Sequence, residues 1–318
     1  MILIGGLATA CFNTSNIDVF PFPEDKLSAR IVQTIGDDRT DNRILLLEID
    51  GVITGQGESF LFWDKEATTA EITKKLNKAA RDDRIKAVVL RINSPGGGVT
   101  ASDIVYRQVL DYKRKTRVPV VAVMMDVAAS GGYYIACASD KIVAHPTTVT
   151  GSIGVIIYAL GFNGLFEKIG MESRVIKSGE LKDMGNPFDE FTEQERAVFQ
   201  NVVDQMYDRF VNVVVENRRL EKARVREIAD GRIYVGGEAG ELGLVDRVGY
   251  LEDGVRLAMD EAGVTSAKVM IYTNTPKKEL NVYSNNLVKA PEINSLMPSA
   301  DMMLDAARPR IMYMWLGQ

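Results

Sequence analysis

Three nearly continuous apolar runs alternate with amphipathic segments along the first half of the chain. The runs cover residues 44–49, 87–92 and 118–123, and apolarity of this kind is typical of strands buried on both faces of a sheet. Between the runs, apolar side chains recur at helical spacing in segments around Ile72 and from Ala101 onward. This order of strands and helices predicts an α/β fold with βαβ crossovers and a mostly parallel sheet.

The pattern changes in the second half of the chain. Thr192, with Glu195 three residues later, forms the signature of a capping box at the start of the longest expected helix. Beyond Gly263 the periodicity weakens, and residues 273–298 are polar and rich in turn formers. We expect this tail to reach over another surface or to be disordered.

The N-terminal residues differ from the rest of the chain. Residues 1–17 carry no charged side chain, and the stretch is shorter than the roughly 20 residues of a membrane-spanning helix. It has the length of a signal-peptide apolar region, although no Lys or Arg precedes it. Cys11 lies in a degenerate version of a lipoprotein cleavage site, so lipidation there is a further hypothesis. A buried apolar terminus is the alternative.

These features divide the chain into four parts. Residues 1–17 are expected to be an export or anchor segment, and residues 18–42, which are mostly polar, a linker. Residues 43–262 are expected to form the catalytic domain, and residues 263–318 a C-terminal extension.

Composition narrows the possible functions. The chain has 38 Lys plus Arg against 43 Asp plus Glu and a net charge of −5, which argues against a nucleic-acid binder with a broad basic face. Two cysteines and one histidine cannot supply a zinc site of the His/Cys type. We therefore expect no zinc-type metal site and no nucleic-acid partner. We also expect the chemistry to need no organic cofactor.

Small residues surround the candidate nucleophile, Ser130. It follows an apolar strand and precedes Gly131 at the start of an expected helix, where a substrate backbone can approach and a developing negative charge is favoured. The glycine-rich loop that contains Gly97 follows the neighbouring strand but lacks the spacing of a nucleotide-binding motif. Amides of Gly97 and Ser130 could jointly hold an oxyanion. Alternatively, Ser130 is only a helix cap and the glycines form a flexible turn.

A serine nucleophile needs a base. His145 is the only imidazole in the chain, and no nearby carboxylate is placed to orient it, so a structural role is the better interpretation. A lysine base must be desolvated, because holding an ordinary lysine neutral near pH 7.5 costs about 4 kcal/mol. Lys182 lies in a glycine-containing loop, and Ser152 could orient its amine. Alternatively, Lys182 is an ordinary surface lysine and Ser152 is a turn residue.

Six ordered motifs between Arg43 and Ala262 resemble the signal peptide peptidase A family, also called protease IV, whose members are membrane-associated serine peptidases with a Ser-Lys dyad. The motifs lie at residues 93–98, 126–134, 150–155, 177–183, 230–234 and 243–246.

The resemblance implies roles for individual residues. Ser130 would be the nucleophile, Lys182 the general base and Ser152 the residue that orients the lysine. Gly97, together with the amide of Ser130, would bind the oxyanion. It also implies a crotonase-like α/β fold related to the Clp protease subunit, and the length fits the short form of the family, in which protomers form a homo-oligomeric ring.

The expected activity is endoproteolysis of remnant signal peptides or other hydrophobic peptides at the membrane. The expected location is the bacterial cell envelope, with the catalytic domain outside the cytoplasm and in contact with the membrane surface. Two other classes stay open: a crotonase-type acyl-CoA enzyme and a catalytically inactive membrane scaffold. Neither of them needs Ser130 and Lys182 together.

Overall fold

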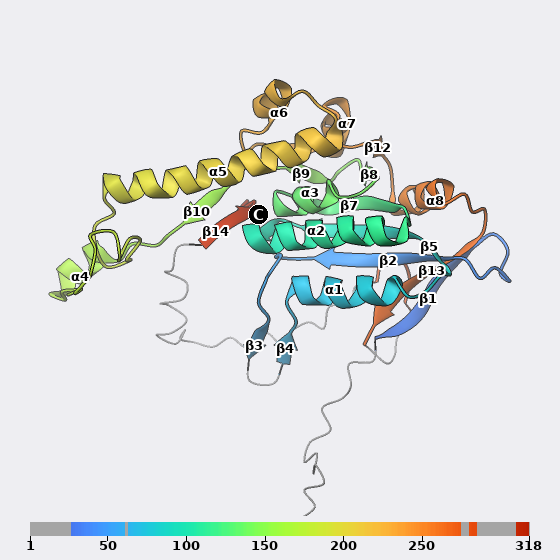
Figure 1. Cartoon of the computed structure of the whole chain (residues 1–318), viewed down its shortest axis with the longest axis horizontal. Coiled ribbons are helices and arrows are strands. Elements are labelled where there is room, and N and C mark those ends of the chain that lie inside the picture. The colour runs from blue at the N-terminus through green and yellow to red at the C-terminus, as the bar shows by residue number, and fades with distance from the viewer. Residues whose placement is uncertain (1–26, 61–62, 275–279, 285–309, 318) are drawn as a thin grey trace, which may run out of the picture.

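The computed structural model describes residues 27–60, 63–274, 280–284 and 310–317. Its central element is a nine-stranded sheet (Figure 1). Seven strands follow in the order β1 (Ser28–Ile35), β13 (Ala267–Thr273), β2 (Arg43–Asp50), β5 (Ile85–Ser94), β7 (Val120–Ala129), β8 (Lys141–Ala144) and β12 (Arg247–Val248). Two more strands branch from β7, namely β9 (Val149–Gly151) and its neighbour β11 (Ile233–Val235). Only the β1/β13 and β9/β11 pairs in this sheet are antiparallel.

Two smaller sheets accompany the large one. The first has three strands in the order β10 (Ile156–Tyr158), β14 (Arg310–Met314) and β6 (Gly96–Gly98). The second is the hairpin of β3 (Glu58–Phe60) and β4 (Trp63–Lys65). The helices are α1 (Thr68–Ala79), α2 (Val99–Thr116), α3 (Gly131–Ala136), α4 (Asn163–Ile169), α5 (Glu193–Arg218), α6 (Lys222–Ile228), α7 (Gly236–Glu241) and α8 (Leu251–Glu261).

Helices cover both faces of the large sheet, which explains the unbroken apolar runs. Along β2, Leu45 and Leu47 belong to the core under α1, α2 and α3, whereas Ile44 and Leu46 pack into a second core under α8. Because successive side chains of a strand point to opposite faces, both faces need apolar residues. The α/β class, the mostly parallel sheet and the alternation of strands and helices are confirmed.

The structure differs from the expected domain boundaries at both ends of the catalytic domain. Residues 28–35, placed in the expected linker, form β1, and residues 267–273 of the expected extension form β13 between β1 and β2. β1 is an edge strand with mostly exposed side chains, so it lacks the apolar run that reveals a central strand. Residues 1–17, including Cys11, lie outside the described residues. Among the described residues, no helix is long and apolar enough to cross a membrane.

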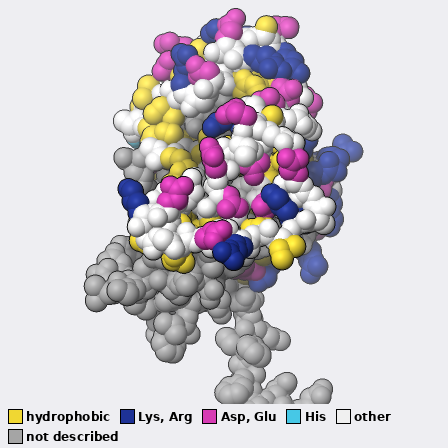
Figure 2. All heavy atoms as spheres, turned by 90° about the vertical axis from the view of Figure 1, so that its left-hand side faces the viewer, with side chains coloured by type: hydrophobic (Ala, Val, Ile, Leu, Met, Phe, Trp, Pro, Cys, Tyr) yellow, Lys and Arg dark blue, Asp and Glu magenta, His cyan; other side chains and the backbone are white. Residues whose placement is uncertain are grey.

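The segment between β10 and α5 projects from the body (Figure 1); we call residues 159–191 the arm. Its α4 contributes no buried residue, and several of its apolar side chains are exposed, among them Leu165, Ile169 and Ile176. Figure 2 shows this end of the molecule, where acidic and apolar side chains are interspersed. The long helix α5 then begins with the predicted capping box, in which Thr192 and Glu195 exchange hydrogen bonds.

A buried charged cluster ties the C-terminal part to the sheet. Arg91, which is 2% exposed on β5, forms an ion pair with Glu48 on β2 and donates hydrogen bonds to the carbonyls of Val282 and Ser284. Nearby, the Oδ2 atom of Asp50 is buried without a hydrogen-bond partner among the described residues. Burial raises the pKa of Asp50 from 3.8 to about 6, although Arg91 opposes the shift.

The Asp50→Asn variant tests this cluster. Because the folded state favours protonated Asp50, the group contributes stability at pH 4 that is lost as the pH rises through about 6. We expect the variant to raise the free energy of unfolding at pH 7.5 by about 1–2 kcal/mol and to leave it nearly unchanged at pH 4. Urea denaturation at the two pH values measures this difference.

Asp82→Asn is the matched control. A hydrogen bond from Arg84 lowers the pKa of Asp82, so its charged form is the one that folding favours. This variant should lower stability at pH 7.5, and an equal response of both variants would contradict the assignment to Asp50.

Candidate active site

Ser130 lies in a strained turn between β7 and α3. It is the N-cap residue of α3 and has φ 52° and ψ −115°, a backbone conformation that side-chain-bearing residues rarely adopt. The residue is 1% exposed, and its Oγ is buried without a hydrogen-bond partner among the described residues. A polar atom in that state is costly in a core, which points to a functional rather than a structural role.

The backbone of Ser152, like that of Ser130, has a positive φ angle. Among the described residues, four other than glycine have positive φ; two of them, Arg117 and Arg219, are C-caps of α2 and α5, where this conformation is common. The other two are Ser130 and Ser152, at φ 52° and 48°. The backbone N–H of Ser130 donates to the carbonyl of Gly151, at 2.8 Å, so the two predicted site serines lie on adjacent strand ends.

The glycine-rich strand β6 lies against the start of α3. A Cβ atom on Gly96 would lie 2.8 Å from the backbone nitrogen of Gly131, the residue after Ser130. On its other side, β6 is held by Ile53, which donates to the carbonyl of Gly96 at 2.9 Å and accepts from the N–H of Gly98 at 3.0 Å. The structure therefore brings Gly97, Ser130 and Ser152 to one edge of the sheet, as the sequence predicts for strand ends.

One predicted oxyanion donor is not free. The Ser130 amide was expected to act with Gly97, but it is engaged by Gly151, because Ser130 still continues the pairing of β7 with β9. The amide of Gly131 is the better candidate, since the first residue of a helix has no acceptor within that helix. The sequence shows a glycine directly after the nucleophile. It does not show whether the amide of Ser130 or that of Gly131 takes part in the pairing of β7 with β9.

Lys182 is not brought to the other site residues within one chain. It is exposed and lies on the arm, which projects away from the body (Figure 1). Within the described chain, no hydrogen bond or ion pair joins Lys182 to Ser130 or Ser152. Its segment is ordered locally by an ion pair between Lys177 and Asp183, at 2.7 Å. The Ser-Lys dyad stays a prediction that one chain alone does not complete.

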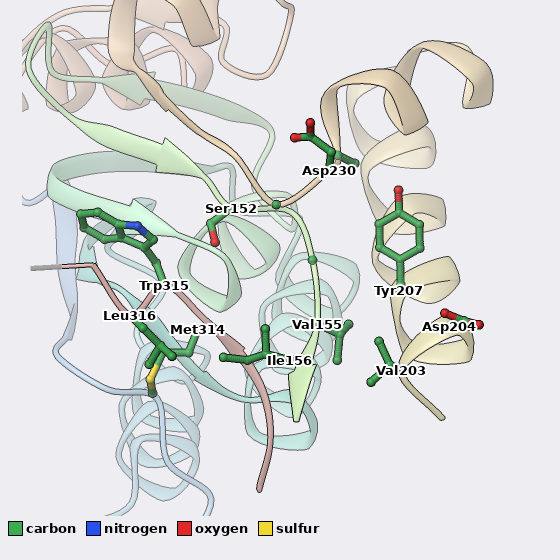
Figure 3. A pocket seen from close by; sticks show the side chains of 13 residues that line it. Ser152, Val155, Ile156, Val203, Asp204, Tyr207, Asp230, Met314, Trp315 and Leu316 are labelled. Carbon is green, nitrogen blue, oxygen red and sulfur yellow. The ribbon is translucent and has the colours of Figure 1, made fainter. Parts of the chain in front are cut away.

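A cavity of about 500 Å³ opens beside Ser152 (Figure 3). Its lining is apolar along β10 and the end of the chain, and acidic near α5 and the loop before β11. The lining residues are Ser152, Gly154, Val155, Ile156, Val203, Asp204, Tyr207, Ala229, Asp230, Gly231, Met314, Trp315 and Leu316. Met314 to Leu316 come from the expected extension and were not predicted to approach the site.

His145 makes local contacts only with residues outside the candidate site. Its Nδ1 lies 2.8 Å from the hydroxyl of Thr147, and its ring packs edge-on against Tyr250, with 4.7 Å between the ring centroids. In the part of the chain that the structure describes, no cluster of three metal-ligating side chains occurs.

Sequence comparison places this site in a known family. A profile of peptidase family S49 matches residues 112–265, the part that contains Ser130, Ser152 and Lys182. A putative signal peptide peptidase SppA of Enterococcus faecium is 42% identical over 76% of this chain and 70% of its own length. A putative protease of Synechocystis is 36% identical over 76% of this chain and 82% of its own length.

Protease 4 of Haemophilus influenzae is 35% identical over 68% of this chain, which corresponds to 34% of that protein. The fold and the site thus define a serine peptidase. The chain belongs to peptidase family S49. Among solved structures, a membrane-bound stomatin-specific protease aligns with a TM-score of 0.44 and 15% identity, over 68% of this chain and 84% of that one.

Gly97→Ala tests the geometry of the glycine-rich strand. The added Cβ would lie 2.1 Å from the carbonyl oxygen of Ile53, so β6 must move away from the oxyanion position. Removal of one oxyanion donor costs roughly 100-fold or more in kcat, and we expect a loss of that size in peptide hydrolysis.

Gly98→Ala is the matched control on the next residue. Its added Cβ would be in ordinary contact, with Ala101 Cβ 3.7 Å away, so we expect nearly full activity. Equal losses in both variants would show that the approach of Ile53 to Gly97 has no special importance.

Proposed function

We propose that this peptidase is an endopeptidase in which Ser130 is the nucleophile and Lys182 of a neighbouring copy is the general base. The observation that carries the proposal is the separation of the two residues. Among the described residues, the Oγ of Ser130 has no hydrogen-bond partner, and Ser130 lies beside Ser152. Lys182, in contrast, lies exposed on a projecting arm (Figure 1). A second copy can supply the lysine that the site of the first one lacks.

The surface of the arm supports this assembly. Its exposed apolar side chains, including Leu165, Ile169 and Ile176, favour burial against another protein surface. Repetition of one such contact around an axis produces a closed ring.

In the proposed mechanism, the amine of Lys182 takes the proton from the Ser130 hydroxyl as the oxygen attacks a peptide carbonyl. The amides of Gly97 and Gly131 stabilise the oxyanion. The lysine then protonates the leaving nitrogen, and water hydrolyses the acyl-enzyme. Burial of the arm between copies would exclude water, which favours the neutral amine that can accept a proton. Ser152, beside Ser130, would orient that amine.

The proposed substrates are hydrophobic peptides such as cleaved signal peptides. The apolar wall of the cavity, with Val155 just before β10 and Ile156 at its start, supports this class (Figure 3). The uncharged residues 1–17 support attachment at a membrane surface, with the catalytic domain on the outer side of the bacterial cytoplasmic membrane.

Mixing of two inactive variants tests the shared site. Ser130→Ala and Lys182→Ala should each lose at least about 1,000-fold in hydrolysis of an apolar reporter peptide. When the two are dissociated, mixed in equal amounts and reassembled, about a quarter of the sites combine an intact serine with an intact lysine from different copies. Activity should therefore return to roughly that fraction of the wild-type value.

Two controls complete the experiment. Lys168→Ala removes another lysine of the arm and should leave activity nearly unchanged, whereas Lys182→Arg should stay inactive because a guanidinium does not release its proton. Mixed assemblies without activity, formed from variants shown to co-assemble, would place both residues of the dyad in one chain.

A further inference from the structure

One end of the helix pair α1 and α2 is strongly basic, although the chain as a whole is acidic. Residues 74–86 and 107–117 form the C-terminal halves of the two helices and the residues directly after them. They contain eleven Lys or Arg and three Asp or Glu, while the whole chain has a net charge of −5. The helices pack side by side and end on the same side of the body (Figure 1). We call the exposed Lys and Arg side chains of these two segments the basic end.

The helix dipoles account for only part of this charge. Cations in the last turn of a helix are favoured by the partial negative charge of its carbonyl end, which applies to Lys78 on α1 and to Lys115 on α2. Arg81, Arg84 and Lys86 lie beyond the end of α1, where this effect fades. The two helices therefore do not need the full set of cations.

Local ion pairs also leave part of the charge uncompensated. Five carboxylates form ion pairs with Lys or Arg of the two segments: Asp82 with Arg84, Asp111 with Arg107 and Arg114, Glu66 with Lys74, Glu71 with Lys75 and Asp140 with Lys113. Arg81, Lys115 and Arg117 are exposed, and among the described residues no ion pair involves any of them. Their charge is directed to the solvent, where it attracts an external anionic partner.

The chain enters the folded body at the basic end. The carbonyl of Leu27 accepts a hydrogen bond from the ammonium of Lys78 on α1, and this ammonium also lies 5.0 Å from the ring centroid of Tyr272 on β13. Residues 1–17 are uncharged, and the chain from Ile17 to Leu27 can span at most about 35 Å. A membrane that holds residues 1–17 is therefore within that reach of the basic end.

The candidate active site lies at the opposite end of α2. This helix begins at Val99, directly after the glycine-rich strand β6, and ends at Thr116. Its 18 residues span about 27 Å. A surface that covers the basic end therefore leaves the sheet edge with Ser130 open to peptides.

We propose that the basic end docks on the anionic lipid headgroups of the membrane that holds residues 1–17. This inference rests on the membrane attachment that is part of the proposed function. Each Lys or Arg close to an anionic lipid surface strengthens binding, and the contact is screened by salt. An apolar segment and a basic patch together give firmer attachment than either one alone.

A lipid surface explains the observations better than another polyanion does. A nucleic acid or an acidic protein would account for the positive charge. Neither would account for its position, beside the point where the chain arrives from an uncharged segment. The membrane accounts for both.

Cosedimentation of the assembled full chain with vesicles tests the docking. One set of vesicles contains phosphatidylcholine alone, and the other contains phosphatidylcholine and phosphatidylglycerol at 7:3. Residues 1–17 contribute equally to both, so the difference between the sets reports the electrostatic contact. We expect at least about tenfold stronger binding to the anionic set, and we expect this gain to disappear in about 0.5 M salt.

A pair of charge-reversed double variants assigns the contact to the basic end. Arg81→Glu with Lys115→Glu should abolish most of the gain from phosphatidylglycerol. Lys222→Glu with Arg256→Glu is the matched control, because it makes the same change in net charge at exposed positions of α6 and α8. The control should keep the gain, and equal losses in the two double variants would overturn the assignment to the basic end.

Hydrolysis of a soluble apolar reporter peptide separates this inference from the peptidase function. Both double variants should keep the wild-type rate, since their substitutions lie far from Ser130. Equal binding of the wild-type assembly to both vesicle sets would overturn the docking and leave the attachment by residues 1–17 in place. Absence of binding to either set would count against the attachment itself, and absence of hydrolysis in the wild-type chain would count against the peptidase.

Two further measurements identify a different partner. Tight binding of a single-stranded oligonucleotide without a gain from phosphatidylglycerol would assign the basic end to nucleic acid. Dissociation of the assembly by Arg81→Glu with Lys115→Glu, seen by size-exclusion chromatography, would make this end an interface between copies of the chain. Either result overturns the lipid contact.

Discussion

The close approach of the strand β6 to the first turn of α3 is the constraint on which the site depends. A Cβ atom added to Gly96 would lie 2.8 Å from the backbone nitrogen of Gly131, and one added to Gly131 would lie 3.2 Å from the Cα of Gly96. A Cβ atom added to Gly132 would lie 2.9 Å from the carbonyl oxygen of Ser94, at the end of β5. Glycine at these positions lets two backbones meet where other residues would separate them. The strained Ser130 is held at this contact, and an oxyanion site can form from amides of both segments.

The small sheet of β10, β14 and β6 connects the arm and the C-terminal strand to the candidate site. β14 pairs on one side with β6, beside the nucleophile, and on the other side with β10, which leads into the arm. The backbone of β14 is thereby fixed by hydrogen bonds on both sides. The fold thus holds Ser130 rigidly at the sheet edge, while the arm carries Lys182, the proposed base, away from it (Figure 1).

Much of this arrangement could be predicted from sequence because it depends on local patterns. The two-faced apolar runs predict β2, β5 and β7, and the small residues around Ser130 indicate the strand end of the candidate site. β1 and β13 were missed, since β1 is an exposed edge strand without an apolar run. The position of Lys182 relative to Ser130, and the return of Tyr313 to Gly97, depend on contacts distant in sequence, which periodicity does not encode.

The central claim is that Ser130 is an activated nucleophile, and covalent labelling tests it most directly. The assembled protein would be treated with a fluorophosphonate and the modified peptide located by mass spectrometry, with Ser130→Ala and Lys182→Ala in parallel. The account predicts an adduct on Ser130 of the wild-type chain that is absent from the first variant and strongly reduced in the second. Failure of Ser130 to label in folded, assembled protein would contradict it.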